Sequence, residues 1–323
     1  MLLERETCMS SDVDQVQEMV YALAASPNFA TDGVCFAARQ SGLYRSDDGG
    51  RTWRSLFDGL GLEALLSATS VALSPSFQSD GAVFAGVPGG ILRSMDGGKN
   101  WSTAILPPPP PFISALAVSP NYANDGVVFA GTMEDGIFRS GDRGAHWEAW
   151  NFGLLDLNVL CLSISPDLAH DETLYAGTDS GVFRSTNGGR AWRETGFPAE
   201  AAPVLSLTVS PLFARDGVLF AGTESCGLFY SKDRGQSWQR VAKRNIPRTV
   251  NAILLSPRFP QKPDILVLTD KALLVSRDGG RSWSKRGTSA ELKAGITSVV
   301  APSGFGQRSR LLVGLADGRV LHV

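Results

Sequence analysis

The chain has 323 residues, of which 35 are glycine and 18 are proline, and only 19% are charged. A hydrophobic content of 43% is enough for a packed core and excludes a disordered chain. The net charge of −2 creates no overall field for nucleic acid or an anionic membrane, so we predict neither as a partner.

The ends and the cysteines bear on location. Residues 1–12, MLLERETCMSSD, carry no apolar stretch behind a basic start, so no secretory signal is expected. No apolar run approaches the roughly 18 residues of a membrane helix, and no membrane span is predicted. The four cysteines, Cys8, Cys35, Cys161 and Cys226, have no metal-site spacing and fit a reducing compartment. We therefore predict a cytoplasmic protein without metal or cofactor.

Two short units repeat along the chain at spacings of 45 to 48 residues. The first begins with Ser-Pro and runs through an aromatic residue to Asp-Gly, as in residues 26–33 (SPNFATDG). The second begins with serine and ends with tryptophan, as in residues 46–53 (SDDGGRTW). Its other copies begin at Ser94, Ser140, Ser185, Ser231 and Ser276. A fixed period of this length indicates a repeat architecture.

Each period carries four strand-like runs; in the fifth they are residues 204–210, 218–223, 227–231 and 237–242. Four short strands per period are typical of a β-propeller blade. The first unit occurs seven times, weakly at Ala301, so we predict an all-β fold: one seven-bladed β-propeller of four-stranded antiparallel blades over residues 1–323. The blades are predicted at residues 16–60, 66–106, 112–153, 157–198, 203–243, 249–287, and 294–323 plus 1–10.

The last blade has no fourth strand of its own, because the chain ends after the run at residues 319–323. We predict that residues 1–10 supply this strand and close the ring. The second strands repeat an aromatic residue, which we expect to fill the space between blades. These residues are Phe36, Phe84, Phe129, Tyr175 and Phe220.

The Ser-x-Asp-x-Gly-x-x-Trp unit resembles the Asp-box, or BNR repeat, whose family places it as the hairpin turn between the third and fourth strands of a blade. The acid would accept amide hydrogen bonds, the last glycine would take a positive φ and the tryptophan would anchor the turn. Even spacing around the ring favours this structural role over metal binding or catalysis. The residues are Asp48, Asp96, Asp142, Asn187, Asp233 and Asp278, with Trp53, Trp101, Trp147, Trp192, Trp238 and Trp283.

Asp-box propellers include sialidases, xyloglucan-processing glycoside hydrolases, sortilin-type receptors and photosystem II assembly factors. The Phe/Tyr-Arg-Ile-Pro motif of sialidases is absent here. Resemblance to the assembly factors implies protein binding. A glycoside hydrolase needs two carboxylates about 5–10 Å apart. Candidates in loops on one face are Glu63, Glu134, Asp135, Asp156, Asp179, Glu200, Glu224, Asp270 and Asp317.

In four blades an arginine precedes the box serine: Arg45, Arg93, Arg139 and Arg184. The same blades carry an aspartate between their first two strands: Asp32, Asp80, Asp125 and Asp171. We predict an Arg–Asp contact within each of these blades. A recognition patch made of the arginines is the alternative.

The connections between blades depart most from the repeat. Five consecutive prolines between blades two and three predict an exposed polyproline II segment, and a basic cluster lies between blades five and six. A stiff spacer and a solvated cluster are the plainer interpretations. All connections between blades share one face of the disc, and we predict partner binding there. The candidate residues are Leu106, Pro107, Pro108, Pro109, Pro110, Pro111, Phe112, Lys243, Arg244 and Arg248.

The sequence therefore favours a non-catalytic protein-interaction propeller, a scaffold or subunit of a protein complex that binds through this face. The alternative is a carbohydrate-active propeller, which would bind or hydrolyse a glycan with carboxylates of the same face.

Overall fold

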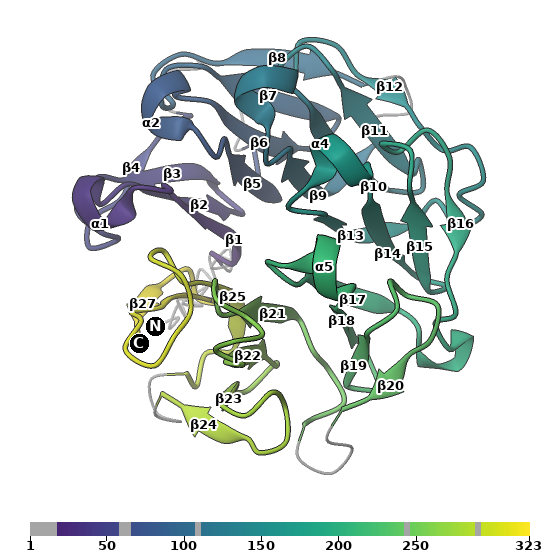
Figure 1. Cartoon of the computed structure of the whole chain (residues 1–323). Coiled ribbons are helices and arrows are strands. Elements are labelled where there is room, and N and C mark those ends of the chain that lie inside the picture. Colours follow the sequence, from purple (N-terminus) through teal and green to yellow (C-terminus); the bar gives the residue numbers. More distant parts are fainter. Residues whose placement is uncertain (1–17, 58–65, 107–110, 242–245, 288–291) are drawn as a thin grey trace, which may run out of the picture.

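The computed structural model describes residues 18–57, 66–106, 111–241, 246–287 and 292–323. Seven small antiparallel sheets stand around a central axis, each with its first strand innermost and later strands farther out (Figure 1). The protein is a seven-bladed β-propeller, as the repeat predicts.

Six blades have four described strands each. Blade 1 holds β1 (Val20–Ala25), β2 (Cys35–Arg39), β3 (Gly42–Ser46) and β4 (Arg54–Ser55); blade 2 holds β5 (Ser70–Leu73), β6 (Val83–Val87), β7 (Gly90–Ser94) and β8 (Ser102–Ile105); blade 3 holds β9 (Phe112–Val118), β10 (Val128–Met133), β11 (Ile137–Ser140) and β12 (Glu148–Ala149). Blade 4 holds β13 (Val159–Ile164), β14 (Leu174–Thr178), β15 (Val182–Ser185) and β16 (Arg193–Glu194); blade 5 holds β17 (Val204–Val209), β18 (Leu219–Thr223), β19 (Leu228–Ser231) and β20 (Gln239–Arg240); blade 6 holds β21 (Ala252–Leu255), β22 (Ile265–Leu268), β23 (Leu273–Ser276) and β24 (Ser284–Arg286).

Blade 7 has three strands in the described residues, β25 (Ile296–Val300), β26 (Leu312–Leu315) and β27 (Val320–His322). The predicted fourth strand, residues 1–10, lies outside the described part of the chain. The two ends of the ring meet at the axis, where β1 packs against β25 and the Ser298 hydroxyl donates to the Val20 carbonyl at 3.5 Å.

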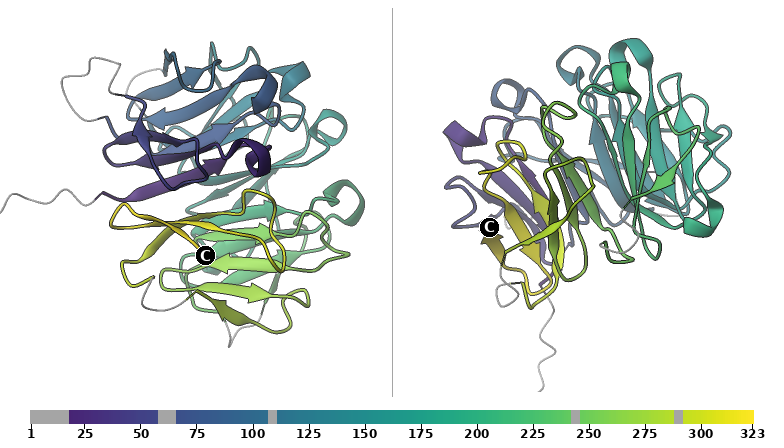
Figure 2. Two further views of the ribbon diagram at one scale, coloured as in Figure 1. Left: turned by 90° about the vertical axis from the view of Figure 1, so that its left-hand side faces the viewer. Right: turned by 60° about the horizontal axis from the view of Figure 1, so that its bottom comes forward.

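The strands cross the thickness of the disc, which Figure 2 shows from other sides. Because the strands of a blade are antiparallel, the turns after first and third strands share one face, and the turns after second and fourth strands share the other. The first face carries the boxes and is called the box face. The second carries the connections between blades and is called the inter-blade face.

The Ser-Pro unit contains a helical turn in five blades. In blade 1 the Ser26 hydroxyl donates to Asp32 at 2.5 Å, and Asp32 also accepts from the Val34 amide at 2.9 Å. The aspartate thus ties the two ends of its own turn together. The five turns are α1 (Phe29–Asp32), α2 (Phe77–Asp80), α3 (Tyr122–Asp125), α4 (Leu168–Asp171) and α5 (Phe213–Asp216); a 3-10 turn, η2 (Ala199–Ala201), precedes β17.

The predicted Arg–Asp contacts within blades are wrong. The short aspartate side chain is taken by its own serine and amide, and in blades 1 and 2 the longer arginine reaches the next blade. Arg45 donates to the Gly97 carbonyl of blade 2, and Arg93 donates to the Arg143 carbonyl of blade 3 at 3.2 Å. These arginines connect neighbouring blades.

The boxes form the predicted turns. In blade 1 Asp48 accepts from the amides of Arg51 and Thr52 at 3.0 and 2.9 Å and from the Thr52 hydroxyl at 2.7 Å. These hydrogen bonds, the Thr52 hydroxyl first, hold the pKa of Asp48 well below its ordinary value. Gly50 has φ +89° and donates its amide to the Ser46 hydroxyl at 2.8 Å. The acids therefore serve the turn, as the resemblance implies.

The box tryptophans are less buried than anchoring by burial suggests. Trp192 is 2% exposed, whereas the other five are half-buried. In four boxes the indole N–H instead donates to the carbonyl of the last box glycine, at 3.0 to 3.2 Å. Hydrogen bonding and partial packing together hold these turns.

The aromatic residues of the second strands fill the space between blades, as predicted, and none of the five is more than 3% exposed. Phe84 meets Tyr122 of blade 3 edge to face at 5.9 Å between ring centres, and Tyr175 meets Phe213 of blade 5 at 5.7 Å. Phe36, Phe84 and Tyr175 thus pack on the helical turn of the following blade, and Phe220 packs on Phe259 of blade 6, so the core lies between blades as well as within them.

Candidate functional site

The structure describes four of the ten predicted partner-binding residues. Leu106 is 2% exposed and packs with the core residues of blades 2 and 3, and Pro111 is also buried, so neither offers its side chain to a partner. This corrects the prediction for both. Phe112 is 49% exposed and Arg248 is exposed. The other six, Pro107, Pro108, Pro109, Pro110, Lys243 and Arg244, lie outside the described residues.

A set of exposed apolar side chains occupies the connections on both sides of blade 3. Of seven exposed large hydrophobic residues in the described chain, five lie in or at the ends of the connections from blade 2 to 3 and from blade 3 to 4; Ile105 ends β8 and Phe112 begins β9. Together they are called the apolar surface: Ile105, Phe112, Phe152, Leu155 and Leu157. Ile105, Phe152 and Leu155 are each at least 76% exposed. Phe152 stands beside the box of blade 4, where its carbonyl accepts from the Trp192 amide at 2.8 Å. Exposed large apolar side chains of this kind mark interaction sites.

Backbone hydrogen bonds link these connections to the hairpins of the inter-blade face. Ile105 pairs with Gly90 at the end of the β6–β7 hairpin. Phe112 pairs with Met133, which begins the β10–β11 hairpin. The amide of Gly136, at the far side of that hairpin, donates to the Leu157 carbonyl at 2.9 Å. Ile105, Phe112 and Leu157 therefore stand on successive hydrogen-bonded elements.

Polar side chains hold the connection that carries Leu155 and Leu157. Asp156 accepts from the amides of Asn158 and Ser180, at 3.0 and 2.7 Å. Asn158 in turn accepts from the Glu134 amide at 2.9 Å. Burial raises the pKa of Asp156, but the hydrogen bonds from Asn158 and Ser180 outweigh it and leave the pKa below its ordinary value. The Asp156 carboxylate thus links the connection between blades 3 and 4 to the β14–β15 hairpin of blade 4.

Arg248 lies elsewhere on the inter-blade face, between blades 5 and 6. Its carbonyl accepts from the Gly227 amide at 2.6 Å, which fixes the backbone. A groove of about 430 Å³ there is lined by Arg248, Asp270, Lys271 and Lys285 among others. Three of these four charges are positive, so the groove is basic.

Two of the carboxylates proposed for glycan chemistry do not have the environment of a general acid. Such an acid needs a raised pKa. The hydrogen bond from Arg319 lowers the pKa of Asp317, and the pKa of Asp156 is also lowered. Glu63 lies outside the described residues. In the described ranges, no three His, Cys, Asp or Glu side chains are grouped so that they could hold a metal ion.

The apolar surface is largely absent from the sequence prediction. Phe112 was predicted, and Ile105 precedes the predicted run by one residue. Phe152, Leu155 and Leu157 were missed, although their segment, NFGLLDLN, lies outside both repeat units. Apolar residues in a non-repeating connection are the signal that could have found them. None of the described helices is long and apolar enough to cross a membrane.

The sheets and their order define a seven-bladed β-propeller. A family model of the BNR/Asp-box repeat matches residues 229–240, which span the box of blade 5. With five further boxes in register, the chain is an Asp-box repeat propeller. A search of curated protein sequences finds no significant match.

Solved structures of the same fold come from different kinds of protein. The GH74 xyloglucanase from Xanthomonas campestris has a TM-score of 0.75 and 19% identity, over 93% of this chain and 51% of the xyloglucanase. YCF48 bound to D1 peptide has a TM-score of 0.70 and 17% identity, over 95% and 93% of the two chains. YCF48 from Cyanidioschyzon merolae has a TM-score of 0.67 and 16% identity, over 95% of each chain. Likeness at these identities shows the fold alone.

Proposed function

We propose that this chain is a non-catalytic protein-interaction propeller of the cytoplasm, a scaffold or subunit of a complex that binds its partner through the inter-blade face. The observation that carries the proposal is the apolar surface around blade 3. Burying such side chains against a partner removes apolar area from water, at about 25 cal/mol per Å².

The make-up of the surface fits protein recognition. Phe112 and Phe152 are large and rigid and can fill pockets of a partner, and Leu155 and Leu157 are exposed in the same connection as Phe152. Hydrogen bonds at Gly136, Asn158 and Asp156 hold the backbone of the connections, which lowers the entropy cost of binding. The similar fold of YCF48, solved with a D1 peptide, supports the view that such a ring can hold a peptide. The xyloglucanase likeness keeps a glycan as the alternative ligand.

The test is a pull-down from an extract of the source organism with tagged wild-type protein and a Phe112→Ser/Leu155→Ser double variant. Both side chains are exposed, so the fold should persist. We expect the wild type to recover a stoichiometric partner and the double variant to bind it at least about tenfold more weakly. Met95→Ser is the matched control, since Met95 is 38% exposed on the box face.

Equal recovery of the partner by wild type and double variant would refute the proposed surface. Binding or hydrolysis of a xyloglucan oligosaccharide, with no protein partner recovered, would favour the carbohydrate alternative.

A further inference from the structure

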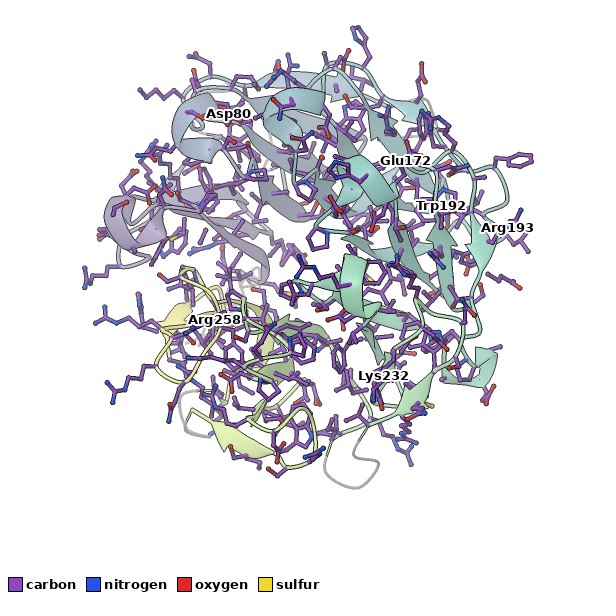
Figure 3. The ribbon with its side chains drawn as sticks, in the orientation of Figure 1. Asp80, Glu172, Trp192, Arg193, Lys232 and Arg258 are labelled. Atoms are coloured by element: carbon purple, nitrogen blue, oxygen red, sulfur yellow. The ribbon has the colours of Figure 1, made fainter. Side chains whose placement is uncertain are left out.

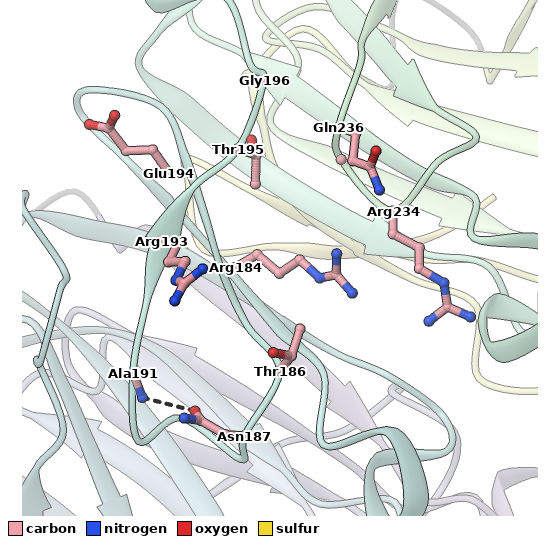
Figure 4. Close-up of a pocket in the computed structure, with 11 residues that line it drawn as sticks. Arg184, Thr186, Asn187, Ala191, Arg193, Glu194, Thr195, Gly196, Arg234 and Gln236 are labelled. Carbon is pink, nitrogen blue, oxygen red and sulfur yellow. Dashed lines mark hydrogen bonds between the residues drawn. The ribbon is translucent and has the colours of Figure 1, made fainter.

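A groove of about 570 Å³ lies on the box face between blades 4 and 5, away from the apolar surface. Three arginines line it, Arg184, Arg193 and Arg234, and Glu194 is its one acidic side chain (Figure 4). Arg193 lies at the outer rim of blade 4, next to Trp192 (Figure 3). The groove therefore has an excess of positive charge.

Two of these arginines oppose each other on neighbouring strands, because Arg184 of β15 pairs in register with Arg193 of β16. Like charges directly opposite each other destabilise a sheet. Neither arginine forms an ion pair within the described residues. The pair is thus available to an anionic group from outside the described chain.

Blade 1 contains the same arginine pair and shows what neutralises it. Arg45 and Arg54 oppose each other there, and the Asp47 carboxylate contacts both of them. Asp47 accepts from Arg45 Nε and Nη2 at 2.8 and 2.5 Å, and its other oxygen is 3.5 Å from Arg54 Nε. Blade 4 has Thr186 at the position of Asp47, so the pair lacks its carboxylate.

A second departure from blades 1 and 2 concerns the Arg184 guanidinium. In those two blades the corresponding arginine donates to the fourth box carbonyl of the next blade, whereas Arg139 of blade 3, like Arg184, makes no such hydrogen bond among the described residues. In blade 4 that carbonyl, on Arg234, accepts from the Tyr175 hydroxyl at 2.8 Å, where blades 1 to 3 have phenylalanine. Arg184 makes no side-chain hydrogen bond to the described residues, and its Nε is buried without a partner.

A third departure adds a donor. Asn187 replaces the box acid in blade 4, and its Oδ1 accepts from the Ala191 amide at 2.9 Å, the dashed line of Figure 4. Its amide nitrogen has no partner among the described residues. In the other five boxes a side chain at the Ala191 position donates to the second carboxylate oxygen: Thr52, Asn100, His146, Ser237 and Ser282. Blade 4 has lost both the acid and that donor.

We propose that this groove binds a carboxylate group of a ligand, held by Arg184 and Arg193 as Asp47 is held in blade 1, with the Asn187 amide as a further donor. The guanidinium fork fits a planar carboxylate with two parallel hydrogen bonds. The carboxylate belongs either to an acidic side chain of a protein partner or to a small carboxylic acid. The site is separate from the proposed partner surface and holds or fails independently of it.

Thr186→Asp tests the proposal, because it copies blade 1 and places an internal carboxylate between the arginines. The probes are a fluorescein-labelled hexaglutamate peptide, measured by fluorescence anisotropy at low ionic strength, and citrate, measured by calorimetry. Labelled hexaglutamine controls for the peptide backbone. Met95→Asp is the control variant, since it adds the same charge at the same box position of blade 2, where Ser102 opposes the arginine.

We expect wild type and Met95→Asp to bind a carboxylate probe alike and Thr186→Asp to bind it at least about tenfold more weakly, while its thermal stability is no lower than that of the wild type. Binding of hexaglutamate alone assigns the site to an acidic side chain, and binding of citrate as well assigns it to small acids. The proposal is overturned if the wild type binds neither probe, if hexaglutamine binds as tightly as hexaglutamate, or if Thr186→Asp binds like the wild type.

Discussion

Replacing Phe84 by alanine should test how strongly the space between blades holds the ring. Phe84 is fully buried and packs edge to face on Tyr122. The packing is tight, since a Cβ placed at Gly144 would lie only 2.5 Å from the Phe84 ring. Removing the ring loses its burial and leaves a cavity, at a cost of about 3–5 kcal/mol, whereas Phe84→Leu should cost about 1–2 kcal/mol. Phe152→Ala makes the same chemical change at an 80% exposed position and should cost less than about 0.5 kcal/mol.

The assay is equilibrium urea unfolding of the wild type and the three variants, followed by circular dichroism. A change in midpoint at constant slope reports a change in stability. If Phe84→Ala lost no more stability than Phe152→Ala, the blade interfaces would contribute little and the argument from burial would be wrong.

Two further predictions concern the turns of the box face. Gly81 has φ +61°, and a Cβ there would lie 2.8 Å from the Gly97 amide nitrogen, so Gly81→Ala should lower the free energy of unfolding in urea by more than about 1 kcal/mol. Gly306→Ala is the control and should be neutral, because a Cβ there would have nothing within 4 Å. Equal effects of the two substitutions would contradict this reasoning. Hydrogen bonds, the largest from the Ser237 hydroxyl, lower the pKa of Asp233 from 3.8 to about 2. A folded pKa below the unfolded one gives stability that is complete above the unfolded pKa and is lost as the pH falls through the folded pKa. The free energy of unfolding should therefore decline from about pH 5 to 2, and Asp233→Asn should reduce that decline. A decline of the same size in that variant would count against the assignment.

The repeat made the ring predictable from sequence alone. Seven copies of one unit define the blades, and the aromatic residue at Phe84 and its equivalents points to the space between them. Such residues recur because each blade meets the same environment. The contacts of these residues therefore repeat with the sequence, and the repeat was sufficient to predict the blades and the aromatic residues between them.

The polar side-chain contacts between neighbouring blades could not be predicted from the repeat. Arg45 reaches Gly97 of the next blade rather than Asp32 of its own, because side-chain length and the competing Ser26 hydroxyl decide the partner. Leu106 was expected on the surface, but three-dimensional packing turns it into the core. At Asn187 the sequence shows only an amide in place of the box acid, and the opposing Arg184 and Arg193 reveal a groove there.

The aromatic contacts between blades have a direction: Phe36 meets Phe77 of the next blade, Phe84 meets Tyr122, and Phe220 meets Phe259. Each blade therefore offers one surface forward and a different one backward, as subunits do in a head-to-tail oligomer. Such an interface produces a closed ring only when the rotation from one blade to the next divides a full turn evenly, so the geometry of one contact sets the number of blades. The chain behaves as a cyclic heptamer joined covalently, and its final interface brings together Val20 and Ser298, 278 positions apart in sequence.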